Sequence, residues 1–212
     1  MPDKDINIIE KHSLILRCTH WINVVLLSLM VWSGVLIYWA NDEYITIPDQ
    51  LAKALSINSR LGIGLSWHFF IMWPFLINGM VYVTYMLISG EWRSLAINKQ
   101  TFKDAIQVTL YELKIKKTQP EQIGKFNAAQ RLTYFSVILM AIGAVITGLA
   151  IYKPVTLGWL TAMLGGYKAA RLEHFILMLG FIFFVIIHII QVARSGWNNF
   201  RAMVAGYEIE KK

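Results

Sequence analysis

The chain has 212 residues, of which 56% are hydrophobic and only 16% are charged, and its formal net charge at pH 7 is +7. This composition is too apolar for a soluble domain, and the chain is too short for a large transporter, which leaves one compact membrane domain. The single cysteine, Cys18, excludes an internal disulfide framework, a four-cysteine iron–sulfur cluster and a covalent CxxCH haem site. We expect Cys18 to be a small buried residue.

Four stretches are long and apolar enough to form helices across a hydrocarbon layer about 30 Å thick. Helix is the open-chain form that satisfies every backbone polar group within lipid. In chain order the stretches cover about residues 14–40, 63–88, 132–152 and 172–193. Pro74 lies inside the second stretch, where we expect it to kink the helix rather than end it. The predicted fold of residues 1–212 is therefore all-α, an integral membrane four-helix bundle.

Most of the 20 Lys and Arg residues fall on one side of these spans. They lie in the N-terminal flank, in the connection 91–131 and in the C-terminus. Because basic residues collect on cytoplasmic loops, this distribution predicts that both termini and that connection are cytoplasmic. The same distribution accounts for the net positive charge, so binding to nucleic acid is not needed to explain it.

Apolar residues and lysines alternate at close to helical spacing over residues 101–117, within the connection 91–131. Two interpretations remain open for this stretch. It can be an amphipathic helix in the membrane interface, or it can be a solvated loop with some helix.

Four of the five histidines, His20, His68, His174 and His188, lie in the predicted spans. The fifth, His12, precedes the first span, and we expect it at the surface. An ionisable residue within a membrane span is costly and usually functional. One such histidine alone is often only hydrogen-bonded to a neighbour. The depths of the four histidines in the membrane decide between this structural role and a functional one.

The four histidines form two pairs when their depths are compared. His174 and His188 are 14 residues apart. That spacing is nearly four helical turns and places both on one face, roughly 21 Å apart. The first span starts in the cytoplasm with His20 near its start, at the inner depth of His188. The second and fourth spans start outside, with His68 and His174 near their starts. We therefore predict an inner pair, His20 with His188, and an outer pair, His68 with His174.

Two neutral imidazoles that face each other in an apolar bundle suit a low-spin haem iron whose axial positions are both filled. Such a haem transfers electrons, whereas a zinc site would need three or four ligands together. The sequence thus predicts two haem b groups with the four histidines as iron ligands. Arg17 and Arg194 on the inner side, and Arg60 and Arg171 on the outer side, are candidates to bind the haem propionates. Each arginine can equally be a topology or headgroup anchor.

Four segments carry a resemblance that covers nearly the whole chain. They are RCTHWINVVLLSLMVWSGVLIYW with His20, LSWHFF with His68, EHFILMLGFIFFVIIH with His174 and His188, and NAAQR at residues 127–131. In these segments the chain resembles the bacterial di-haem cytochrome b subunits of membrane-bound oxidoreductases. That family includes the gamma subunit of formate dehydrogenase, the cytochrome b of nickel–iron hydrogenase and the thiosulfate-reductase-type cytochrome b. The resemblance implies the same histidine pairs and a multi-pass protein of the bacterial cytoplasmic (inner) membrane.

The resemblance also implies that the inner haem exchanges electrons with a quinone. It places Asn127 and Gln130 near that quinone, whereas the alternative is that Asn127 merely caps the third helix. The formate dehydrogenase pattern has a glycine where this chain has Ala129, a departure that weakens the case for close backbone approach. The tail RSGWNNFRAMVAGYE is most similar to cytochrome b subunits of molybdopterin oxidoreductases.

The leading hypothesis is a di-haem b-type cytochrome subunit that carries electrons across the membrane. It would connect the quinone pool with a periplasmic, molybdopterin-type oxidoreductase, directly or through an iron–sulfur or cytochrome subunit. A first alternative is a free-standing quinone oxidoreductase, such as a superoxide:quinone oxidoreductase, with an outer pocket of Lys53, Arg60, Lys168 and Arg171. A second alternative, a non-redox membrane anchor or metal transporter, predicts no bound haem. Membrane lipid is the remaining expected partner.

Overall fold

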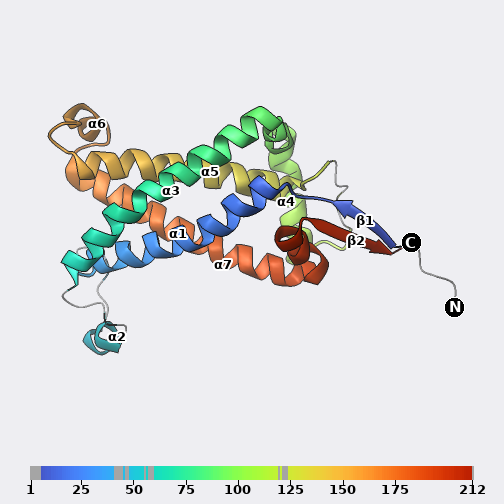
Figure 1. Ribbon diagram of the computed structural model, residues 1–212, viewed down its shortest axis with the longest axis horizontal. Helices are drawn as coiled ribbons and strands as arrows, with labels where there is room; N and C mark the ends of the chain where they lie inside the picture. Colours follow the sequence, from blue (N-terminus) through green and yellow to red (C-terminus); the bar gives the residue numbers. More distant parts are fainter. Residues whose placement is uncertain are drawn as a thin grey trace. The chain divides into compact units, whose positions relative to one another are not determined.

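The computed structural model describes residues 6–40, 45, 48–54, 56, 60–118, 120 and 124–211 (Figure 1). Residues 119 and 121–123 of the connection 91–131 therefore lie outside the described residues. The elements are β1 (Ile6–Glu10), α1 (Leu14–Tyr38), α2 (Asp49–Ala54), α3 (Leu61–Ser89), the 3-10 helix η1 (Glu91–Leu95), α4 (Lys99–Glu112), α5 (Ala128–Tyr152), α6 (Gly158–Met163), α7 (Tyr167–Ala205) and β2 (Tyr207–Lys211).

Within the described part of the chain, four helices are long and apolar enough to cross a membrane: α1, α3, α5 and α7. The all-α membrane fold is thereby confirmed. Helix α3 continues through Pro74 without a break. Helix α5 begins at Ala128, before the expected residue 132, because its first turn is polar and hydropathy does not detect it. Helix α7 extends well past the expected residue 193.

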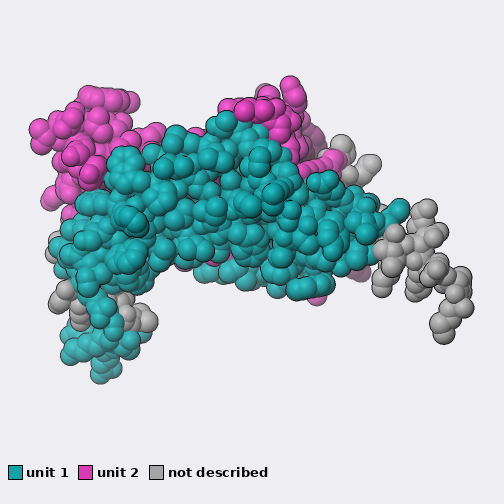
Figure 2. Space-filling model, viewed as in Figure 1, with its two compact units in different colours: residues 1–85, 186–212 teal, residues 86–185 magenta. Residues whose placement is uncertain are grey.

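The chain divides into two compact units, shown in teal and magenta in Figure 2. The first comprises residues 1–85 and 186–212, and the second comprises residues 86–185. In the first unit, α1 and α3 pack closely where Gly64 meets the end of α1. A Cβ atom on Gly64 would lie 2.9 Å from Leu36 Cβ and 3.1 Å from the backbone nitrogen of Ile37. Glycine is therefore the residue that permits this helix contact.

Replacing Gly64 with alanine is expected to destabilise the protein by about 1–3 kcal/mol, because the added methyl group meets backbone that cannot rotate away. The measurement is thermal unfolding of the purified protein in detergent. Gly62→Ala is the matched control, since a Cβ atom there has no neighbouring atom within 4 Å among the described residues. Equal melting temperatures for the two variants would show that the helices do not approach this closely.

In the first unit, the N-terminal strand β1 pairs with the C-terminal strand β2. Helix α7 changes direction at Gly196, whose φ of 81° and ψ of 172° are accessible mainly to glycine. The segment that follows, residues 197–211 (the C-terminal segment), ends in β2, which pairs antiparallel with β1 so that Ile8 lies opposite Ile209 (Figure 1). Lys11 forms an ion pair with Glu208. Hydropathy gave no indication of this two-stranded sheet, because both strands are short and partly charged.

In the second unit, α5 packs against α4, η1 and α6. Its middle approaches α7 closely, since a Cβ atom on Gly143 would lie 3.2 Å from a Leu177 methyl carbon. Lys125 forms a 3.0 Å ion pair with Glu91, which ties the beginning of α5 to η1. The Thr161 hydroxyl donates to the carbonyl of Ala150 at 3.2 Å, which holds α6 against the end of α5.

Candidate functional site

His20 on α1 and His188 on α7 face each other within the first unit. Their ring centroids are 6.1 Å apart, and the ring planes make an angle of 60°. Two metal–imidazole bonds of about 2 Å each, with a ring radius of about 1 Å at both ends, put two centroids about 6 Å apart. The observed separation of the ring centroids is of this size, and the two rings are arranged edge to face. Both side chains are half-buried.

The position of His20 is fixed by contacts from two sides. The Trp21 ring stands edge-on to the His20 ring, with centroids 5.4 Å apart. The Trp21 indole N–H donates to the carbonyl of Met203 at 3.1 Å, which links this position to the C-terminal segment. On the other side, the buried Asn78 amide of α3 donates to the carbonyl of Thr19 at 3.0 Å. The sequence pattern singled out neither Trp21 nor Asn78 for this role.

His68 on α3 has a defined hydrogen-bond partner on α1. Its Nδ1 atom lies 2.9 Å from the Ser33 hydroxyl oxygen, and Ser33 is fully buried. That hydroxyl donates its one hydrogen to the carbonyl of Leu29 at 2.8 Å, with Met30 O also in range at 3.1 Å. With its hydrogen on the carbonyl of Leu29, this hydroxyl accepts the second bond in the His68 tautomer that carries the proton on Nδ1.

His174 on α7 has the same arrangement in the second unit. Its Nδ1 atom lies 2.9 Å from the Thr147 hydroxyl oxygen on α5. With the Thr147 hydrogen on the carbonyl of Gly143 at 2.7 Å, this hydroxyl accepts from His174 in the tautomer that carries the proton on Nδ1. A Cβ atom on Gly148 would lie 3.3 Å from His174 Cε1, so glycine leaves room for the ring.

A protonated Nδ1 leaves the lone pair of the imidazole on Nε2, the nitrogen that binds a metal. Histidines that bind metals usually donate their other ring N–H in this way, and the partner fixes both tautomer and ring orientation. Among the described residues, no three His, Cys, Asp or Glu side chains gather as a metal cluster. The donor set thus fits a metal with two protein ligands, as haem iron has.

The candidate arginines differ in their contacts. Arg17 donates from Nη1 to the carbonyl of Val204 at 2.7 Å, while its Nε atom is buried with no hydrogen-bond partner in the described structure. Arg60 is exposed just before α3, and Arg194 is exposed on α7. Arg171 lies over the Tyr167 ring, 6.0 Å from its centroid. A role with haem propionates stays a prediction for all four.

Asn127 and Gln130 form a reciprocal cap at the beginning of α5. Asn127 Oδ1 accepts from the Gln130 backbone N–H at 2.9 Å, and Gln130 Oε1 accepts from the Asn127 backbone N–H at 3.0 Å. Both side-chain oxygens therefore stabilise the helix terminus, as the capping alternative expected. The side-chain NH₂ groups are the donors that a quinone carbonyl would use.

Two expectations about single residues were wrong. His12 is buried at 8% exposure, because the C-terminal segment folds over it and the carbonyl of Gly206 accepts from its backbone N–H at 3.3 Å. Cys18 is exposed, because Thr19 rather than Cys18 turns toward the packed side of α1. In a membrane-spanning helix, an exposed face of this kind contacts lipid.

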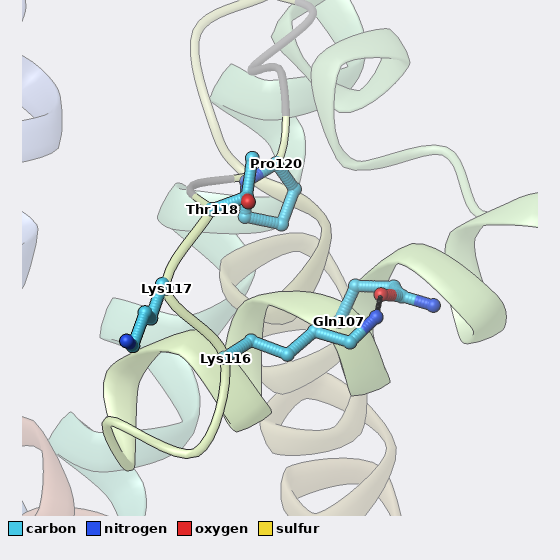
Figure 3. Close-up of a pocket in the computed structure, with 5 residues that line it drawn as sticks. All are labelled: Gln107, Lys116, Lys117, Thr118 and Pro120. Atoms are coloured by element: carbon cyan, nitrogen blue, oxygen red, sulfur yellow. Dashed lines mark hydrogen bonds between the residues drawn. The ribbon is translucent and has the colours of Figure 1, made fainter.

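A surface pocket lies where the chain leaves α4 (Figure 3). Its lining comprises Gln107, Lys116, Lys117, Thr118 and Pro120. The Lys116 ammonium group donates to the Gln107 side chain across it. None of the four span histidines belongs to this lining, so we assign the pocket no part in their chemistry.

Two comparisons with known proteins bear on the class of protein to which this chain belongs. A family model described as prokaryotic cytochrome b561 matches residues 11–206, a range that contains all four span histidines. A protein of Azospira oryzae named as a putative protein-methionine-sulfoxide reductase subunit, YedZ1, is 35% identical over 182 residues. The match covers 84% of this chain and 87% of that protein.

Proposed function

The chain belongs to the prokaryotic cytochrome b561 family, and from this premise we propose that it is a di-haem subunit that carries electrons across the bacterial inner membrane. Membership of the family makes the chain a membrane-embedded b-type cytochrome. Our proposal adds that it holds two haems, that it reacts with quinol on the cytoplasmic side and that it serves a periplasmic catalytic subunit. Both termini are cytoplasmic in this proposal, as the distribution of Lys and Arg predicts.

The observation that carries the proposal is the 6.1 Å separation between the ring centroids of His20 and His188. We assign these two residues as the axial ligands of the inner haem. Haem iron with both axial positions filled supplies one-electron transfer. The buried Nε of Arg17, three residues before His20, is a donor that a haem propionate would satisfy.

His68 and His174 are the proposed ligands of the outer haem. Two observations support this pair. The two residues have the same predicted depth in the membrane, and their side chains have similar surroundings. Each has its Nδ1 atom 2.9 Å from a helix hydroxyl oxygen, and the tautomer that donates Nδ1–H to that hydroxyl leaves Nε2 available to iron. Arg60 and Arg171 are the proposed propionate partners on that side.

Quinol is the proposed electron donor at the inner side, next to Asn127 and Gln130. Oxidation of quinol to quinone releases two electrons and two protons. The amide NH₂ groups of Asn127 and Gln130 are suited to hold a quinone carbonyl by hydrogen bonds. Their position at the beginning of a membrane span is one where released protons can reach water.

The proposed acceptor is a periplasmic catalytic subunit of the molybdopterin type. The Azospira relative is named as a subunit of a protein-methionine-sulfoxide reductase, and we propose a sulfoxide reductase of this kind as the partner. Reduction of a sulfoxide takes up two electrons and two protons and gives a thioether and water. Quinol oxidation supplies that number of electrons, so the direction of transfer is from the inner haem to the outer haem.

The test is anaerobic reduction of the purified, haem-loaded chain by duroquinol, followed by the optical spectrum of its haems. We expect reduction by duroquinol, and a rate that falls at least tenfold in Asn127→Ser. Serine keeps the N-cap, so the melting temperature should stay unchanged while the amide donor is lost. A chain that binds no haem would overturn the proposal. Rapid reduction by superoxide without a partner subunit would favour the free-standing quinone oxidoreductase.

A further inference from the structure

Helix α4 crosses the beginning of the membrane span α5 at a steep angle, as Figure 1 shows. It is fastened there by one buried face, formed by Thr101, Ala105 and Val108. A helix that lies across the end of a membrane span runs along the membrane surface. The chain that precedes α4 also stays near this surface, since η1 begins two residues after the membrane span α3 ends.

A second face of α4 is apolar and exposed. Phe102, Ile106 and Leu113 are 50%, 61% and 63% exposed. With 100° per residue, these three lie within about 40° of one another, and the centre of this stripe lies about 110° round the helix from the centre of the buried face. The stripe is therefore distinct from the face that packs on α5, and no described residue covers it.

Basic residues border this stripe. Lys99 and Lys103 are exposed on α4, and Lys114, Lys116 and Lys117 are exposed just after it. At Lys114 the backbone turns through the left-handed region, with φ of 59°, so the last lysines follow the end of the helix closely. Of the two acidic side chains on α4, Asp104 accepts from Gln100 at 2.8 Å and Glu112 lies in the last turn. The border of the stripe is thus cationic.

We propose that α4 lies in the interface of the inner leaflet, on anionic phospholipid. The stripe of Phe102, Ile106 and Leu113 inserts at the boundary of the acyl chains. The lysines that border it contact the phosphates, which is the arrangement that interfacial helices adopt. The continuity of α4 with two membrane spans favours lipid over a soluble partner. The proposal rests on the proposed membrane orientation and is independent of the haems.

The test places a nitroxide label at one of two neighbouring positions in the haem-loaded full chain. Cys18→Ser removes the native thiol, and Ile106→Cys or Gln107→Cys then carries the label. Gln107 is the matched control, because it lies one residue further and about 100° round the helix, on the side of the pocket in Figure 3. Accessibility to oxygen and to a water-soluble nickel chelate is measured in lipid nanodiscs by electron paramagnetic resonance.

We expect the label at position 106 to be more accessible to oxygen than to the nickel chelate. The label at position 107 should be more accessible to the chelate. High chelate access at both positions would show a solvated helix. Low access to both reagents at 106 would show that protein covers the stripe. Either result would overturn the proposal, and an unchanged haem spectrum would show that the fold and the haem sites are intact.

A second experiment tests the role of lipid charge. Adding phosphatidylglycerol to phosphatidylcholine nanodiscs should move the label at position 106 deeper into the bilayer. Changing Lys103, Lys114, Lys116 and Lys117 together to Gln should abolish that response. A label depth that does not depend on lipid charge would contradict the role of the lysines, while a deep label in pure phosphatidylcholine would leave the apolar contact standing as a separate result.

Discussion

Replacing His20 or His188 with alanine is expected to lower the haem content from two to one per chain, and replacing both is expected to lower it no further. The reason is that the two ring centroids lie 6.1 Å apart and both residues are proposed ligands of the same iron, so replacing the second residue removes no further haem. The double variant His20→Ala/His68→Ala, which takes one ligand from each pair, should bind no haem. The measurement is a pyridine haemochrome assay normalised to protein.

His12→Gln is the control for this series. His12 is buried against the C-terminal segment, residues 197–211, but lies outside the membrane spans. It should retain both haems. Loss of a haem in this variant would mean that disturbed packing, rather than loss of a ligand, explains the other results. Retention of two haems in His20→Ala would refute the inner pair.

Thr147→Val is expected to weaken haem binding at the outer site by about 10–100-fold, the usual cost of losing the partner of a metal-binding histidine. Valine has the shape of threonine but cannot accept the Nδ1–H of His174, so the hydrogen bond between the two side chains is lost. Thr147→Ser keeps the hydroxyl and should restore affinity. The measurement is the rate at which the outer haem transfers to apomyoglobin, followed by its absorbance.

A matched control for this variant is Thr133→Val on the same helix. The Thr133 hydroxyl bonds to the carbonyl of Ala129 one turn earlier, as Thr147 does to Gly143, but none of its hydrogen bonds goes to a histidine. Equal haem loss in Thr147→Val and Thr133→Val would show that the cost comes from changing a threonine in α5. Loss confined to Thr147→Val would identify the bond to His174 as the cause.

The membrane helices could be predicted from the sequence because twenty or so apolar residues have no alternative structure in lipid. The histidines could be singled out for a related reason, since imidazole is rare and costly at that depth. The comparison of predicted depths in the membrane paired His20 with His188, and in the structure their ring centroids lie 6.1 Å apart. That these residues bind haem iron stays a prediction.

The partners of the histidines could not be predicted in the same way. Ser33 and Thr147 look like ordinary small residues of membrane helices, and they acquire a role only when another helix brings an imidazole to them. The burial of His12 depends on a segment near the other end of the chain, which turns back at Gly196. The pairing of β1 with β2 is likewise set by tertiary contacts and not by local pattern.

The pairing of β1 with β2 has a consequence for how the protein is made. Residues of the first unit come from the earliest and the latest translated parts of the described chain, with the whole second unit synthesised between them. His20 therefore enters the membrane well before His188 exists to face it. If both residues bind the inner haem, as we propose, that haem can bind only after the fourth span has been inserted, and a chain that ends before residue 188 should lack it. The pairing of Ile8 with Ile209 requires residues translated after His188, so it can form only in a polypeptide that already contains both histidines of the inner pair.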